Sequence, residues 1–175
     1  ENNLDVVLVL GFKQPRWPEC FHPNWAIKLS KEEKQKRVLK LIKEEVKTFQ
    51  GFSAIKIWQV ENEPFLSFGA CKGANPLSEN FVKSEVEAVK TLDQRPVLIT
   101  ESGELTTWRK SVDMADISGF SLYRDVWNPN FGYTTYPLPP FFYSAKAALV
   151  KMVFCKTQTP SIISELQTEP WVPAK

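Results

Sequence analysis

Trp58-Gln59-Val60-Glu61-Asn62-Glu63-Pro64 closes a run of strand-forming residues near the middle of the chain. A second such run, Ser161-Ile162-Ile163-Ser164-Glu165, follows later in the sequence. Because proline cannot donate a ladder hydrogen bond, the first strand is expected to end where Glu63 is presented. Two apolar strands that each deliver a carboxylate at their carboxyl end predict a barrel enzyme that uses paired acids.

Strand-like and helix-like segments alternate on both sides of these two runs. Strands are predicted at residues 4–10, 55–60, 96–100, 117–123 and 161–164. Helices are predicted after Ser30 and after Asn75, at about residues 108–115, and at about residues 143–154. Residues 124–140 are predicted to be a long loop. This alternation indicates a parallel sheet, and the lack of a Gly-rich phosphate loop after any strand argues against a nucleotide-binding fold.

The two longer helices carry clear patterns. Ser30-Lys31-Glu32-Glu33 is a capping box. The apolar residues after it recur at three- and four-residue spacing, which predicts one buried stripe: Val38, Leu41, Ile42, Val46 and Phe49. The helix after Asn75 has a shorter stripe of three valines: Val82, Val86 and Val89.

Polar residues gather where the strands end. They are Gln14, Glu63, Glu101, Tyr123 and Glu165. That distribution is typical of the functional face of a (β/α)8 TIM barrel, so the predicted fold is α/β, with one partial barrel domain spanning residues 1–175. Such barrels need about 250 residues, so the chain is expected to cover roughly strands three to seven and to be a fragment of a longer product. A smaller open sheet is the alternative.

Strand alternation predicts which side chains face the interior. It places Gln59, Glu61 and Glu63 on one face of their strand, with Trp58 and Val60 on the other. In the last strand it turns Ser161, Ile163 and Glu165 inward, and in the fourth strand Gly119, Ser121 and Tyr123. A purely structural barrel interior would have Val, Ile or Leu at these positions.

The first acid strand resembles the fourth strand of the clan A glycoside hydrolases, whose Asn-Glu pair carries the acid/base. Asn62-Glu63-Pro64 is similar to the cellulase and mannanase groups, and Gln59 to Glu63 is similar to β-galactosidase groups. Ile163-Ser164-Glu165 resembles the nucleophile strand, the seventh, and Tyr123 falls where that clan often keeps a tyrosine bonded to the nucleophile.

The resemblance implies a retaining glycosidase that acts on a β-linked oligosaccharide or polysaccharide without a cofactor. Glu63 would be the acid/base, Glu165 the nucleophile, and Asn62 would donate to the sugar 2-hydroxyl, with the two carboxyls about 5–5.5 Å apart. Tyr123 would orient Glu165. Trp17, Trp127 and Trp171 lie in predicted loops and offer flat rings on which a sugar can stack, or else they cap the core.

Two other glutamates compete for the nucleophile role. Ile99-Thr100-Glu101-Ser102-Gly103 also looks like a nucleophile strand, but it lies only one strand beyond Glu63, so Glu101 is assigned to substrate binding or pKa tuning. Glu169 follows Glu165 closely and is expected in the loop. A barrel that binds carbohydrate without turnover, or an incomplete fragment of a glycosidase, is the alternative function.

Composition excludes other classes of protein. The chain is 43% hydrophobic and 24% charged, with a net charge of +2 and no basic stripe, which disfavours nucleic acid. No apolar run is long enough to span a membrane. One histidine, His22, disfavours a metal-dependent hydrolase. Cys20 and Cys71 can pair only in an oxidising compartment, Cys155 is expected to be buried, and both secretion and a cytoplasmic location remain open.

Overall fold

The computed structural model describes residues 4–15, 23–66, 76–128, 132–154, 156 and 158–167. Its strands are β1 (Val6–Leu10), β2 (Ile55–Asn62), β3 (Val97–Ser102), β4 (Ile117–Leu122), β5 (Asp125–Asn128), β6 (Gly132–Thr135) and β7 (Ser161–Leu166). Its helices are a 3₁₀ turn, η1 (Asn24–Ala26), and α1 (Lys31–Phe49), α2 (Glu79–Lys90), α3 (Arg109–Met114) and α4 (Pro140–Val153). The strands and helices predicted from periodicity are therefore all present.

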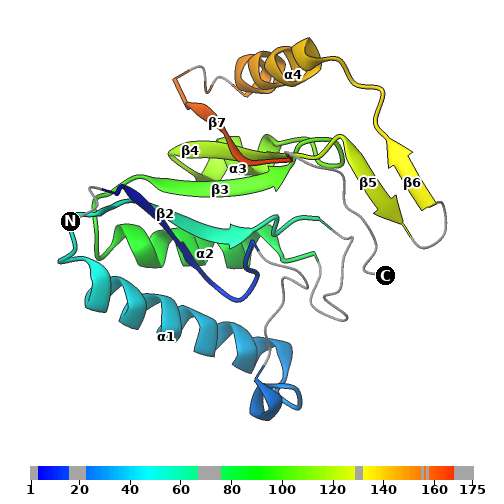
Figure 1. Ribbon diagram of the computed structural model, residues 1–175. Helices are drawn as coiled ribbons and strands as arrows, with labels where there is room; N and C mark the ends of the chain where they lie inside the picture. The colour runs from blue at the N-terminus through cyan, green and yellow to red at the C-terminus, as the bar shows by residue number, and fades with distance from the viewer. Residues whose placement is uncertain are drawn as a thin grey trace.

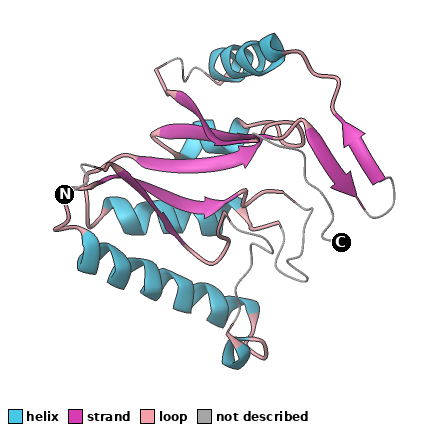
Figure 2. Cartoon of the chain, in the orientation of Figure 1, coloured by secondary structure: helices cyan, strands magenta, loops and turns pink. Residues whose placement is uncertain are grey.

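The main sheet has five parallel strands in the order β1-β2-β3-β4-β7 (Figure 1). A helix separates each successive pair of these strands along the chain, and α1 and α2 lie side by side against one part of the sheet (Figure 2). All five carboxyl ends consequently point the same way, which gathers the residues that follow each strand at one edge.

The predicted (β/α)8 barrel is wrong for this chain. The sheet is open, with β1 at one end of the strand order and β7 at the other. Closing a barrel requires the first and last strands to pair at a fixed stagger, and no such pair occurs among the described residues. The fold is an open α/β sheet with alternating helices.

One element was missed within the predicted loop at residues 124–140. Here β5 and β6 form an antiparallel hairpin, in which Trp127 pairs with Tyr133. Strand-forming residues on either side of an Asn/Pro/Gly segment are a recognised hairpin signal. The hairpin lies outside the main sheet (Figure 1).

The core is divided between two clusters. The larger one packs β1, β2 and β3 against α1 and α2, and Ile42, Val46 and Trp58 are fully buried in it. The smaller one stacks Trp108 on Phe120 at 4.3 Å between ring centroids. The helix-facing side of the sheet is thus apolar, which leaves the other face for polar groups.

The predicted helix patterns are largely confirmed. Ser30 caps α1 by accepting a 3.2 Å hydrogen bond from the backbone N–H of Glu33. The three valines of the α2 stripe are buried. The α1 stripe is narrower than predicted, because Leu41 and Phe49 are exposed at its borders. No helix in the described part of the chain is long and apolar enough to cross a membrane.

Gly103, just after β3, lies where the chain passes close to the backbone of β4. A Cβ atom added there would lie 2.1 Å from the carbonyl oxygen of Ser121 on β4. We expect Gly103→Ala to lower the free energy of unfolding by about 1–3 kcal/mol, because the backbone of β4 must move. The matched control is Gly51→Ala, where nothing lies within 4 Å. Equal urea midpoints for the two variants would contradict this close packing.

Candidate active site

The end of β2 departs from regular alternation. Between Gln59 and Asn62 the pairing with β3 advances three residues on β2 but only two on β3, from Leu98 to Thr100, so β2 contains a bulge. Glu61 and Glu63 have left-handed backbones, with φ of 57° and 44°. A non-glycine residue in this conformation costs about 1–3 kcal/mol and persists only where its surroundings hold it.

The bulge separates Glu61 from its predicted neighbours. The expectation that Gln59, Glu61 and Glu63 share one face is wrong for Glu61. Its carboxylate accepts hydrogen bonds from the backbone N–H groups of Phe12 (3.2 Å) and Lys13 (2.6 Å) in the segment after β1. The bulge is the physical reason, since one extra residue reverses the side to which the following side chain points.

Glu63 is held at three points. Its Oε1 accepts a 2.5 Å hydrogen bond from the Ser121 hydroxyl on β4. Its carbonyl oxygen accepts a 2.6 Å hydrogen bond from the Lys13 ammonium, and its backbone N–H donates to Thr100 on β3. The side chain is 8% exposed. Glu63 is therefore a largely buried carboxylate with a fixed orientation at the carboxyl end of the sheet.

Glu165 reaches the same place from β7. Its Oε2 accepts a 2.7 Å hydrogen bond from the Tyr123 hydroxyl. Its Cα pairs in register with that of Ser121, the residue that contacts Glu63. Its other carboxylate oxygen, Oε1, is buried and has no hydrogen-bond partner among the described residues. Glu63 and Glu165 accordingly belong to strands on opposite sides of β4, the strand that carries Ser121.

A second bulge, at Ser164, sets the face on which Glu165 lies. Phe120 pairs with Ile163 and Ser121 with Glu165, so β7 has one extra residue. The prediction that Ser161 and Ile163 point inward is wrong: Ile163 is 49% exposed, and Ser164 contacts Thr100 on the inner side instead, with 3.0 Å between their hydroxyl oxygens. The extra residue returns Glu165 to the face of Ser121.

The remaining predicted site residues have different positions. Asn62 is buried and pairs with Thr100 on β3. Its Oδ1 accepts a 3.4 Å hydrogen bond from the side-chain amide nitrogen of Gln59. Glu101 accepts a 2.9 Å hydrogen bond from the Ser111 N–H on α3, so it lies against a helix and is not brought together with Glu63. Trp17 and Trp171, which were predicted to stack on the sugar, lie outside the described residues, as does Glu169.

Two residues of this site were missed by sequence reasoning. Ser121 was placed inward but given no role, although it links the two acids. Lys13 was not singled out, yet its side chain is fully buried and binds Glu63. A lysine in the segment directly after a buried strand is the one signal that could have indicated it.

Behind Glu63, two further carboxyls are buried together. Glu61 and Glu85, the latter on α2, are each 0% exposed. Burial raises the pKa of both groups, and the charge of Glu61 raises that of Glu85 further. Hydrogen bonds from Lys13 and Phe12 act in the opposite direction on the pKa of Glu61. The pair therefore retains a proton in conditions where exposed glutamates are ionised.

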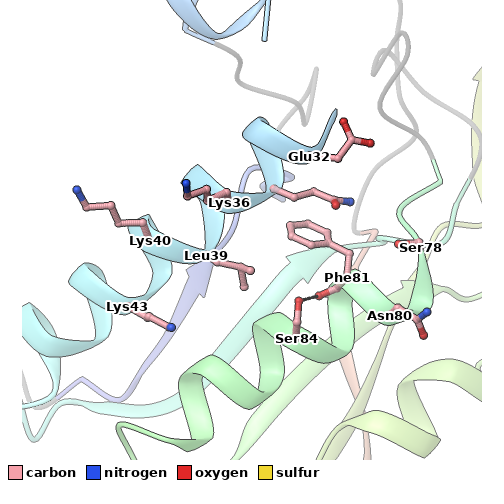
Figure 3. Close-up of a pocket in the computed structure, with 10 residues that line it drawn as sticks. Glu32, Lys36, Leu39, Lys40, Lys43, Ser78, Asn80, Phe81 and Ser84 are labelled. Carbon is pink, nitrogen blue, oxygen red and sulfur yellow. Dashed lines mark hydrogen bonds between the residues drawn. The ribbon is translucent and has the colours of Figure 1, made fainter. Parts of the chain in front are cut away.

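The structure also has an open groove of about 660 Å³ between α1 and α2 (Figure 3). Lysines from α1 and the ring of Phe81 from α2 line it, and neither Glu63 nor Glu165 does. The one carboxyl that lines the groove, Glu32, is exposed in the first turn of α1 and has no second carboxyl beside it in the groove, so the groove is not the candidate active site. Among the described residues no cluster of three or more potential metal ligands occurs.

Solved structures with a similar fold include glycosidases. No protein-family model matches the chain, and no curated protein sequence matches it. The GH2 β-galacturonidase from Eisenbergiella tayi, bound to galacturonate, is similar with a TM-score of 0.54 at 15% identity, over 77% of this chain and 22% of that one. The β-D-glucuronidase from Dictyoglomus thermophilum has a TM-score of 0.54 at 18% identity, over 77% and 21%.

A third similar structure is the Bacteroides uniformis β-glucuronidase 2 that is covalently bound to cyclophellitol-6-carboxylate aziridine. Its TM-score is 0.55 at 17% identity, over 83% of this chain and 16% of that one. The chain thus spans about a fifth of the length of these proteins. At these identities the likeness shows that the chain shares the fold of part of a glycosidase.

Proposed function

We propose that this chain carries the paired acids of a retaining glycosidase that cleaves β-linked O-glycosides by double displacement. One observation carries the proposal: Glu63 and Glu165 approach Ser121 from opposite sides, one by a hydrogen bond and one by strand pairing. Two carboxyls presented at the same end of one parallel sheet, here from β2 and β7, are what this chemistry needs. The fold shared with known glycosidases supports it.

In the first step, the Glu165 carboxylate would attack the anomeric carbon while Glu63 protonates the departing glycosidic oxygen. The bond to that oxygen breaks, and an ester to Glu165 forms. In the second step, Glu63 would remove a proton from water, the water oxygen would attack the anomeric carbon, and the ester bond to Glu165 would break. Each acid begins and ends the cycle in the same protonation state.

The neighbours of the two acids suit these roles. The Tyr123 hydroxyl donates to one oxygen of Glu165 and leaves the other for attack. Ser121 donates to one oxygen of Glu63 and so fixes the orientation of that carboxyl. Asn62 lies beside Glu63 on the inner face and would donate to the sugar 2-hydroxyl, an interaction that strengthens in the transition state.

The substrate class to examine first follows from the structural neighbours. They are a β-galacturonidase and two β-glucuronidases, so β-linked uronides come before neutral sugars in the order of testing. We propose β-glycosides as the substrate and treat the uronic acid group as the first variant. Trp17 and Trp171 remain proposed stacking partners.

Incubation with cyclophellitol aziridines, with and without the 6-carboxylate, tests the proposal. Glu165 is expected to open the ring: its oxygen bonds to carbon, the carbon–nitrogen bond breaks, and Glu63 protonates the nitrogen. Peptide mass spectrometry should therefore find one adduct, on Glu165, and none in Glu165→Gln. An adduct on Glu101 or Glu169 would contradict the assignment of the nucleophile. A folded protein that binds sugar but forms no adduct would support the carbohydrate-binding alternative.

A further inference from the structure

We propose that Glu61 and Glu85 share one proton and act as a positioning pair for Glu63, through Lys13. This inference rests on the proposed role of Glu63 as the acid/base. The pair is fully buried, lies behind the bulge at the end of β2, and takes no part in the two displacement steps. Buried carboxyls that only fill space make the folded protein less stable than apolar side chains of similar size would. Their presence beside Glu63 therefore calls for a function.

The hydrogen bonds identify the carboxyl that carries the proton. Each oxygen of Glu61 accepts a backbone hydrogen bond, Oε1 from Phe12 and Oε2 from Lys13, as an ionised carboxylate does. Both oxygens of Glu85 are buried and accept no hydrogen bond from a donor among the described residues, and the side chain that hydrogen-bonds with Glu85 is the Glu61 carboxyl. A neutral carboxylic acid tolerates such surroundings far better than a carboxylate. Glu85 is therefore the acid and Glu61 the base of the pair.

Raised pKa values agree with this assignment. Burial is the largest cause for both groups, and the negative charge of Glu61 adds to the rise at Glu85. The charged group that faces the pair from another element is the Lys13 ammonium, which lowers the pKa of Glu61. Because one carboxyl is held ionised by its donors, the proton stays on the other.

From Glu61 the contacts lead directly to Glu63. Glu61 fixes the backbone N–H of Lys13, the Lys13 carbonyl accepts from the Asn62 N–H at 3.0 Å, and the Lys13 ammonium donates to the Glu63 carbonyl. These bonds hold the left-handed backbone on both sides of Asn62. Gly11 permits the approach, since a Cβ there would lie 2.4 Å from the Glu61 carboxyl.

The consequence for Glu61→Gln follows from donor and acceptor counting. A glutamine has one acceptor oxygen and one NH₂ group, so it can accept only one of the two backbone N–H groups and presents a donor to the other. The segment that carries Lys13 would then no longer be fixed, and the hydrogen bond from the Lys13 ammonium to the Glu63 carbonyl would be weakened. By contrast, Glu85→Gln keeps a donor directed at Glu61 and removes only the titratable proton.

Infrared spectroscopy tests the shared proton without any substrate. The C=O stretch of a protonated carboxylic acid is expected at neutral pH in the unmodified chain and in Glu87→Gln, an exposed matched control on α2. In Glu85→Gln it should lose the intensity of one protonated carboxyl, while the band of Glu63, the proposed acid, remains. If the unmodified chain and Glu85→Gln have bands of equal intensity at neutral pH, the proton-sharing pair is overturned.

The positioning role is tested by the labelling rate of Glu165 and by the Lys13 amide signal in ¹⁵N NMR spectra. We expect Glu61→Gln to lower the labelling rate at least tenfold and to shift the Lys13 amide, whereas Glu87→Gln changes neither. Glu85→Leu should lower the rate and Glu85→Gln should restore most of it. A folded Glu61→Gln protein with an unchanged rate and amide would overturn the role. If the unmodified chain is never labelled, the proposed function fails, while the infrared band and the Lys13 amide still decide the pair.

The pH dependence of folding provides the measurement if Glu61→Gln does not fold. A carboxyl whose folded pKa lies above its ordinary value of 4.5 keeps its proton while the unfolded chain loses it. Stability is therefore expected to fall as the pH rises above that value, by up to about tenfold in the unfolding equilibrium constant per pH unit and per proton. This slope should be smaller in Glu85→Gln; an identical slope would contradict the assignment of the proton.

Discussion

Glu165→Ala is expected to lower turnover of an activated aryl β-glycoside by at least about 10⁴-fold, because no glycosyl-enzyme can form without the nucleophile. The Tyr123 hydroxyl, which donates to Glu165 at 2.7 Å, then has no carboxylate to orient. Steady-state kinetics on aryl β-glucuronides, β-galacturonides and neutral β-glycosides measures the loss. Thermal unfolding checks that the variant is folded.

Added azide distinguishes loss of the nucleophile from general damage. In Glu165→Ala a small anion can enter the space left by the carboxylate and attack the anomeric carbon in a single displacement. The product is then a glycosyl azide with inverted configuration, which proton NMR identifies. The matched control is Glu101→Gln, whose side chain lies against α3 and should retain most activity. Full loss in Glu101→Gln with activity remaining in Glu165→Ala would reverse the assignment.

Local periodicity predicted the elements of this fold but not how the sheet ends. The strands and helices follow from short-range patterns, such as the valine stripe of α2, whose members are buried in the structure. Closure depends on whether β1 and β7 pair with each other, and these strands are separated by nearly the whole chain. Short-range patterns have no information about such a pair, so the barrel was predicted from the strand–helix alternation, the polar carboxyl ends and the resemblance to clan A glycoside hydrolases.

The orientations of side chains around the candidate site were predicted in part, and the two bulges explain the differences. Alternation along a strand assumes one residue per pleat, and it was right for Ser121, which faces Glu63. It failed at Glu61, and it failed for Ser161 and Ile163 before the bulge at Ser164. A bulge inserts one residue with no obligatory sequence mark, so only the pairing with the neighbouring strand reveals it.

The buried pair illustrates a signal that was present in the sequence. Glu85 lies three residues after Val82 and four before Val89, inside the apolar stripe of α2. A charged residue at such a position must either reach solvent or find a buried partner. The bulge in β2 turns Glu61 toward Glu85, and no pattern in the sequence predicts this bulge.

Glu63→Ala is expected to slow the hydrolysis of glycosides with poor leaving groups by about 10²–10⁴-fold, the usual contribution of general acid catalysis. A dinitrophenyl glycoside should lose far less in its first step, because its leaving group departs without a proton. Its second step still needs a base to activate water. The glycosyl-enzyme should therefore accumulate on Glu165, where mass spectrometry of the quenched reaction detects it.

The comparison of two leaving groups within one variant separates the acid/base from a residue that only supports the fold. Misfolding would slow both substrates equally, whereas a missing proton donor slows only the one that needs it. Azide should raise turnover of Glu63→Ala by attacking the accumulated ester without base assistance, and its product should retain configuration. Equal losses on both substrates, with no trapped ester, would remove Glu63 from the chemistry. Its contacts with Ser121 and Lys13 would then have only a structural role.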